Sequence, residues 1–117
     1  RLTIYGAPGW NGVMAIPAFI ASRQSDIAGL CQRAGARRLD LFGSAVRHDF
    51  DEARSDLDFL VVLDEQAPAA YFDAYFSLKE GLETLFVRPV DLVIEPGIRN
   101  PYFKQQVQAE REAVYAA

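Results

Sequence analysis

The stretch that most constrains this chain is an apolar run opened by two aspartates, Asp56 and Asp58. The run is typical of a buried strand, so we predict a strand over 56–63. Alternate residues of a strand leave the same face, which places the two aspartates together with their Cα atoms roughly 6.6 Å apart. The other face would carry Leu57, Phe59 and Val61.

Two ionised carboxylates held this close repel each other, and either a raised pKa or a bound cation relieves the repulsion. Magnesium suits such a site because it takes one or two carboxylate oxygens and leaves its other positions to water and substrate phosphates. Taken alone, however, the two aspartates are more simply explained as a strand end exposed to water. The pair therefore needs support from elsewhere in the chain.

A third aspartate, Asp91, interrupts the apolar strand that we predict over 90–94. A carboxylate within a sheet is costly unless it has a partner, which here is either an arginine or a metal. If this strand lies beside the strand over 56–63, three carboxylates converge. Three are enough to hold two ions about 3.5 to 4 Å apart.

Gly43 and Ser44 end a strand predicted over 38–42 and open a helical turn. At such a turn, backbone N–H groups and the serine hydroxyl can hold phosphate oxygens, while glycine lets the backbone approach closely. Gly-Ser by itself is a common turn. Its interpretation as a phosphate site depends on the three aspartates.

The other elements follow from apolar spacing and from glycine and proline breaks. We predict helices over 17–34, from Pro68 to the break at Pro89, and from Asn100 through Val114, with a turn at 96–97. The order helix, two strands, helix, strand, helix predicts an α/β (α+β) fold, a small mixed β-sheet flanked by helices. Cys31, the single cysteine, lies on the apolar stripe of the first helix, so we predict a core residue.

The 117 residues fit one compact domain. Residues 1–13 show no helical or strand period, and we expect a disordered tail or a segment foreign to the native protein. Met14 is the only methionine and directly precedes the first periodic segment. We therefore expect the native start at Met14 and the domain over 14–117.

Charge and hydropathy exclude two classes of partner. The formal net charge of −4 gives no general attraction for phosphate backbones, so we expect no binding to long nucleic acid. No apolar run reaches the ~18 residues of a membrane span, and the first residues lack the pattern of a secretory signal. We expect a cytoplasmic protein without membrane contact.

The three motifs together resemble the minimal nucleotidyltransferases, or MNT proteins, of the DNA polymerase beta superfamily. Their pattern is Gly-Ser, then Asp-x-Asp in an apolar strand, then a later Asp in another strand. Here it stands as LFGSAVR over 41–47, SDLDFLV over 55–61 and VDLV over 90–93. The ending, NPYF over 100–103 through Val114 and Tyr115, is also similar, so the resemblance covers about 14–117.

The resemblance implies a nucleotidyltransferase fold that uses ATP or another nucleoside triphosphate. Gly43 and Ser44 would contact the nucleotide phosphates. Magnesium, as two ions, would be bound by Asp56, Asp58 and Asp91, and Asp91 would also help to deprotonate the acceptor hydroxyl.

The loop after the Gly-Ser motif is less well defined. Arg47 would steady phosphate charge, although a solvated loop arginine fits the sequence equally well. The family commonly has glycine at the next position, where this chain has His48, so the path of the loop is open. We interpret His48 as an exposed residue rather than a base. The acidic residues of the loop should face solvent: Asp49, Asp51 and Glu52.

The implied reaction is attack by an acceptor hydroxyl on the α-phosphate of the triphosphate, with release of pyrophosphate. Many members of the family are antitoxins that transfer AMP to a tyrosine of a helical HEPN ribonuclease toxin. Three strands and three helices leave no residues for an acceptor domain, so a partner chain or the acceptor itself would complete the site. Two alternative functions stay open: an antitoxin that acts by contact alone, and an enzyme that modifies a small molecule such as an antibiotic. Assembly as a homo-oligomer is also left open.

Overall fold

The computed structural model describes residues 16–47 and 55–117. Its strands are β1 (Ala36–Phe42), β2 (Leu57–Leu63), β3 (Val90–Ile94) and β4 (Glu112–Ala116). Its helices are α1 (Ala18–Ala21), α2 (Gln24–Ala34), α3 (Ser44–Arg47), α4 (Pro68–Phe86) and α5 (Pro101–Glu110), with a short 3-10 turn, η1 (Glu95–Gly97), after β3. The strands form one mixed sheet in the order β3-β2-β1-β4, in which β2 and β3 are parallel and the other pairs antiparallel.

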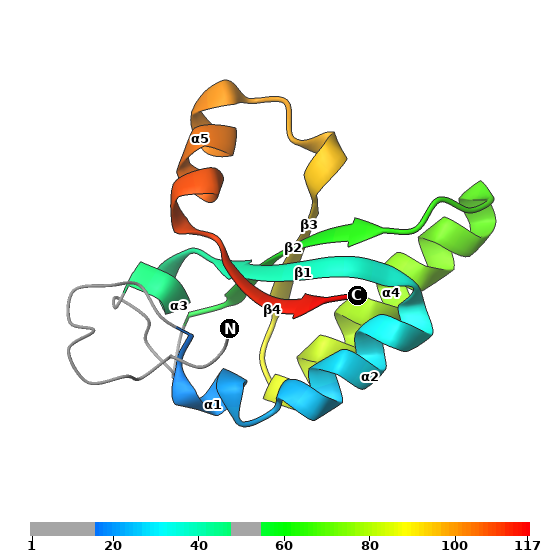
Figure 1. Ribbon diagram of the computed structural model, residues 1–117, viewed down its shortest axis with the longest axis horizontal. Helices are drawn as coiled ribbons and strands as arrows, with labels where there is room; N and C mark the ends of the chain where they lie inside the picture. Colours follow the sequence, from blue (N-terminus) through cyan, green and yellow to red (C-terminus); the bar gives the residue numbers. More distant parts are fainter. Residues whose placement is uncertain (1–15, 48–54) are drawn as a thin grey trace.

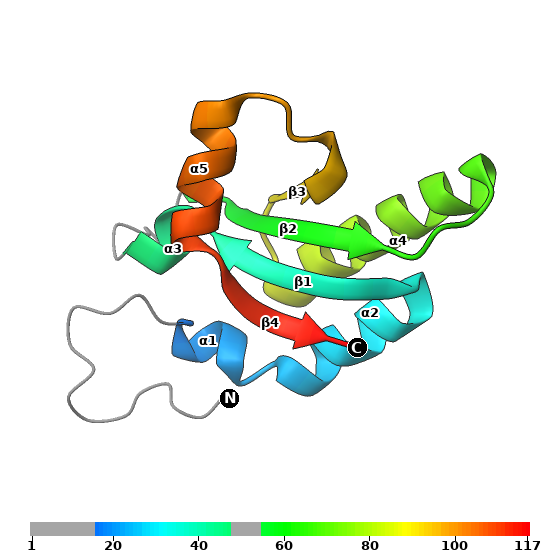
Figure 2. The ribbon, with the colours of Figure 1, turned by 45° about the horizontal axis from the view of Figure 1, so that its top comes forward.

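Helices α2 and α4 cover one face of this sheet and α5 lies over the other (Figure 1, Figure 2). The larger core lies under α2 and α4, where Leu57, Phe59 and Val61 of β2 are fully buried, as their alternation predicts. A smaller core under α5 joins Phe42, Leu60 and Val107. The predicted α/β class with a small mixed sheet is confirmed. Asp58 lies on the face covered by α5.

The helix predicted over 17–34 is divided into α1 and α2. Between them, the Ser22 hydroxyl donates to the Phe19 carbonyl at 3.3 Å, a local bond by which serine competes with the helix backbone. Ile20 and Ile27 lie on either side of this break and are both fully buried. The spacing of apolar residues therefore continues across the break and does not reveal it in the sequence. Gly35 follows α2 as its C-cap, with a left-handed φ of 71°.

The prediction of a final helix through Val114 is wrong. The Asn100 cap is present and accepts from the Tyr102 N–H at 2.9 Å, but α5 ends at Glu110 and the chain then pairs with β1 as a fourth strand, β4. Val107 and Val114 are seven residues apart, a spacing that fits one helical stripe. Both are buried, but in different cores: Val107 under α5 and Val114 in the larger core. The strand predicted over 38–42 also begins earlier, at Ala36.

Several predictions concern single residues or short segments. Cys31 is fully buried and burial raises its pKa to about 12, which confirms it as a core residue. The tail over 1–13, Met14, His48 and the acidic loop residues lie outside the described residues. Within the described ranges, no helix combines the length and the apolar character needed to cross a bilayer.

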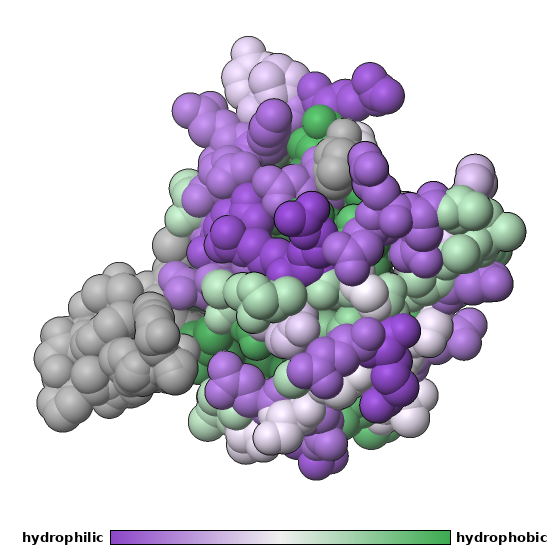
Figure 3. All heavy atoms as spheres, turned by 45° about the vertical axis from the view of Figure 1, so that its right-hand side comes forward, coloured by the Kyte–Doolittle hydropathy of each residue, from purple (hydrophilic) through white to green (hydrophobic). Residues whose placement is uncertain are grey.

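A buried ion-pair network holds the junction between α5 and β4. Asp40 of β1 is fully buried, and its carboxylate accepts from Arg38 Nε at 2.9 Å and from Arg111 Nε. Arg111, the residue between α5 and β4, also donates to both carboxylate oxygens of Glu95, at 3.0 and 2.9 Å. Hydrophilic side chains gather on the surface of this region (Figure 3). The network ties the junction to β1 and to η1.

Replacing Asp40 with alanine should lower the free energy of unfolding by about 3 kcal/mol, because it leaves two arginines without their buried partner. Asp64→Ala is the control: its pair with Arg37 is 3.6 Å long and both side chains are more than half exposed, so its loss should cost under about 1 kcal/mol. Urea unfolding followed by circular dichroism measures both. Equal effects of the two substitutions would contradict the structural role given to Asp40.

Candidate active site

Two of the three predicted carboxylates meet where β2 and β3 run in parallel. The register pairs Asp58 with Asp91, so their side chains leave neighbouring strands on the same face. Neighbouring strands lie about 4.8 Å apart, which is close enough for both carboxylates to face one ion. Asp56 stands directly before β2 and is exposed, as is Asp91, whereas Asp58 is half-buried.

The ionised form of Asp58 is disfavoured by its surroundings in this arrangement. Burial raises the pKa of its carboxyl to about 6, and the negative charges of Asp91 and Asp56 act in the same direction. Arg47 opposes the shift but does not cancel it. A carboxyl whose charge is disfavoured by burial and by like charges is one that a bound cation would stabilise.

The described residues contain no ready-made group of three His, Cys, Asp or Glu side chains that could hold a metal ion. The candidate oxygen donors are the carboxylates of Asp58 and Asp91, which the β2–β3 register pairs. This donor set fits magnesium, which takes few carboxylates and shares its remaining positions with water and phosphate. Asp58 and Asp91, with Asp56 beside them, are the residues that could hold it.

Gly43 brings the end of β1 against Asp58. A Cβ at this position would overlap a carboxylate oxygen of Asp58 and lie 3.0 Å from its Cγ, and the φ of 81° is one that glycine adopts freely. The Gly43 carbonyl then accepts from the N–H groups of Val46 and Arg47, at 3.0 and 3.2 Å. The helical turn predicted after Gly43 is therefore present as α3, with the half-buried Ser44 as its first residue.

Sequence reasoning missed Glu110, the last residue of α5. Its buried carboxylate accepts from the Gly43 N–H at 3.1 Å, from Arg47 Nη1 at 3.1 and 2.9 Å, and from Gln106 Nε2 at 3.2 Å. Burial raises the pKa of Glu110, but the hydrogen bonds from Arg47, Gln106 and Gly43 outweigh this and lower it. The one local signal was a glutamate three residues after Val107, on the apolar side of α5.

This contact changes the expected role of Gly43. Its N–H group, which we predicted to hold phosphate, is already bonded to Glu110. A phosphate oxygen could use that N–H only if the bond to Glu110 broke. The hydroxyl of Ser44 stays a predicted phosphate contact at this turn, as does the guanidinium of Arg47, although its Nη1 already donates to Glu110.

Three side chains of α4 line the outer edge of β3 beside Asp91. The Tyr75 hydroxyl donates to the Leu92 carbonyl at 2.6 Å, and Glu83 accepts from the Val90 N–H at 3.0 Å. Lys79 pairs with Glu83 at 3.0 Å and lies close enough to Asp91 for their charges to interact. Sequence reasoning did not single out Lys79, so its place beside β3 is a result of the structure.

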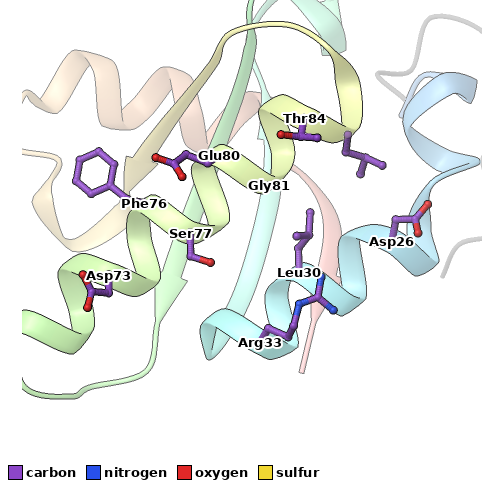
Figure 4. Close-up of a pocket in the computed structure, with 10 residues that line it drawn as sticks. Asp26, Leu30, Arg33, Asp73, Phe76, Ser77, Glu80, Gly81 and Thr84 are labelled. Atoms are coloured by element: carbon purple, nitrogen blue, oxygen red, sulfur yellow. The ribbon is translucent and has the colours of Figure 1, made fainter.

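Two hollows differ in their relation to the carboxylates. One of about 660 Å³ borders β3 and α5 and includes Val93, Ile98, Arg99 and Phe103, so it adjoins the strand that carries Asp91. A larger one of about 750 Å³ lies between α2 and α4 (Figure 4) and contains none of the predicted site residues. Neither hollow is lined by a predicted site residue, so the carboxylates themselves define the candidate active site, which is identified by its chemistry rather than by volume.

Gly43→Ala should destabilise the protein by about 3 kcal/mol, since it adds a clash with Asp58 to an unfavourable φ. Gly35→Ala separates the two causes: Gly35 has a similar φ of 71°, but its nearest neighbour would lie 3.6 Å from the added Cβ. Its cost should be about 1 kcal/mol. Thermal and urea unfolding compare the two, and equal costs would show that the contact with Asp58 does not matter.

Stability should depend on pH through Asp58. Its pKa is raised from 3.8 to about 6, so between these values the folded protein binds more protons than the unfolded chain, and stability falls as pH rises across that window. Asp58→Asn should remove this fall and raise the free energy of unfolding at pH 8 by about 1 kcal/mol, a value reduced for partial exposure. Urea unfolding at pH 4 and 8 without divalent cations is the measurement. A variant less stable than wild type at pH 8 would contradict the assigned repulsion.

Known proteins share both the sequence and the fold. Residues 27–114 match the family model of the nucleotidyltransferase domain. A Methanocaldococcus jannaschii protein named "Putative protein adenylyltransferase MJ0128" is 33% identical over 81 residues, which cover 69% of this chain and 79% of that protein. A solved structure described as a "putative minimal nucleotidyltransferase" is 35% identical with a TM-score of 0.63, covering 78% of this chain and 88% of that chain.

A chain in the structure of tri-AMPylated Shewanella oneidensis HEPN toxin in complex with MNT antitoxin gives a TM-score of 0.57. It covers 84% of this chain and 73% of that chain at 20% identity, and so shows a common fold. The family match extends over most of the described chain and includes the Gly-Ser turn and all three aspartates. The chain therefore belongs to the nucleotidyltransferase domain family and is a nucleotidyltransferase enzyme.

Proposed function

We propose that this protein transfers AMP from ATP, with magnesium, to a hydroxyl of a protein acceptor. The observation that carries the proposal is the pairing of Asp58 with Asp91 in the β2–β3 register, with Gly43 closely packed against Asp58. This geometry supports the proposal, in which the carboxylates would hold a cation and the adjoining turn would contact phosphate. The similarity to a Methanocaldococcus jannaschii protein named as a protein adenylyltransferase supports AMP as the transferred group.

In the reaction, the acceptor oxygen attacks the α-phosphorus, the bond to the β-phosphate oxygen breaks, and pyrophosphate leaves. Magnesium, held by Asp58 and Asp91 with Asp56, would neutralise charge on the phosphates. Asp91 is exposed, and in this proposal it would accept the proton of the acceptor hydroxyl. Ser44 and Arg47 would contact the phosphates, which fixes the triphosphate relative to the carboxylates. Catalysis of this kind rests on positioning and electrostatics rather than on a covalent intermediate.

The acceptor that we propose is a tyrosine of a HEPN toxin, which would make this protein the antitoxin. Support comes from the shared fold with the chain in the complex of tri-AMPylated HEPN toxin with MNT antitoxin. Because the donor would be ATP, we place the reaction in the cytoplasm. The competing function is an antitoxin that neutralises its partner by contact and leaves the carboxylates unused.

The test is to incubate the protein with ATP, magnesium and a HEPN toxin and to follow the mass of the toxin. An added AMP is the expected result. Asp56→Asn combined with Asp58→Asn should reduce transfer by at least about 100-fold, because two cation ligands are lost. Asp64→Asn is the control, since Asp64 is an exposed aspartate beyond the far end of β2 and should leave transfer unchanged.

Two results would count against the proposal. Full activity of the doubly substituted protein, with its fold intact by circular dichroism, would remove the cation role of these aspartates. Tight binding of the toxin without any adduct, tested with each of the four common nucleoside triphosphates, would favour the antitoxin that acts by contact.

A further inference from the structure

Glu110 links α5 to both groups that flank Asp58. On one side it accepts from the Gly43 N–H at 3.1 Å, and on the other its two oxygens accept from Arg47 at 3.1 and 2.9 Å. The three residues come from the end of β1, from α3 and from the end of α5. The Glu110 carboxylate therefore fixes the position of the turn after β1 relative to α5.

The position of Gly43 determines the space around Asp58. The contact is so close that even an added Cβ would overlap the carboxylate. A small movement of Gly43 toward β2 would therefore displace the Asp58 side chain, and a movement away would separate the turn from the carboxylates. Because the Gly43 N–H is bonded to Glu110 of α5, the position of α5 restricts the movement of Gly43 in both directions.

The structure favours a lasting contact over a temporary one. Glu110 is only 8% exposed, and Gln106, one helical turn earlier, donates to it at 3.2 Å. Displacing Glu110 by a phosphate would leave a buried carboxylate without its arginine partner, which is costly. We therefore expect these bonds to persist when a nucleotide binds.

We propose that Glu110 is a positioning residue, which holds the Gly43–Ser44 turn and Arg47 in place against Asp58. The effect of this positioning on AMP transfer rests on the proposed function. The positioning itself does not depend on the reaction and can be measured on the protein alone. Glu110 touches neither the phosphates nor the acceptor in this assignment. It acts through Gly43 and Arg47.

The test compares Glu110→Ala and Glu110→Gln with Gln105→Ala, an exposed residue of α5. The alanine variant loses every bond, whereas glutamine can still accept from the Gly43 N–H but no longer neutralises Arg47. Transfer is measured at a temperature at which circular dichroism shows each variant fully folded. For Glu110→Ala, kcat/KM for ATP should fall about 10- to 100-fold. Glu110→Gln should recover part of the loss, and Gln105→Ala should match wild type.

A second readout does not depend on the reaction. Hydrogen exchange of the Gly43 amide, followed by NMR, should be at least about tenfold faster in Glu110→Ala, while amides in the middle of β2 keep their protection. If wild-type protein transfers nothing but this exchange pattern appears, the proposed function fails and the positioning role stands. Unchanged Gly43 exchange together with wild-type kcat/KM per folded molecule would overturn the positioning role.

The kinetic result also distinguishes positioning from competition. If Glu110 occupied the phosphate position and blocked it, Glu110→Ala would lower KM for ATP and raise kcat/KM. That outcome would overturn the proposal, because it would show that the carboxylate and the triphosphate exclude each other.

Discussion

The ion pair between Asp40 and Arg111 is the contact on which the rest of this arrangement depends. Asp40 is fully buried in β1, and Arg111 is the residue at which α5 gives way to β4. Once Arg111 is bound to Asp40 and Glu95, the neighbouring Glu110 faces Gly43 and Arg47, and the following residues run along β1. One junction thus places both the fourth strand and the carboxylate that supports the site.

Asp40 and Asp58 are two of the acidic groups on this side of the sheet, and they have opposite energetic roles. The charge of Asp40 is compensated by two arginines within the fold, which is why its removal would leave both arginines without their buried partner. Asp58 is undercompensated, because burial and its acidic neighbours raise its pKa to about 6 despite the charge of Arg47. A local cost of this kind is expected where a ligand rather than the fold supplies the missing charge. The ion-pair network around Asp40, in which the charges are balanced, supports the site around Asp58, in which they are not.

Sequence reasoning predicted those residues of the candidate site that have local signals. Asp56 and Asp58 were apparent from strand alternation, Asp91 from its place in an apolar run, and Gly43 from its position at a strand end. It missed Glu110 because the bond to Gly43 joins residues 67 positions apart, and no local pattern specifies such a pair. It missed β4 for a related reason: a spacing of seven between apolar residues fits a helix, and only pairing with β1 decides for a strand. What could not be predicted was the tertiary context of α5 and β4, on which the support of the site depends.

The edge of the sheet limits how an acceptor protein can reach Asp91. Edge strands usually offer free N–H and C=O groups to which another strand can add. On β3 the Val90 N–H is bonded to Glu83 and the Leu92 carbonyl to Tyr75, so side chains of α4 already occupy these two positions. A partner therefore gains little by adding a strand next to Asp91. Under the proposed function, the occupied edge would therefore favour an acceptor that enters as a single side chain over one that binds as an added strand.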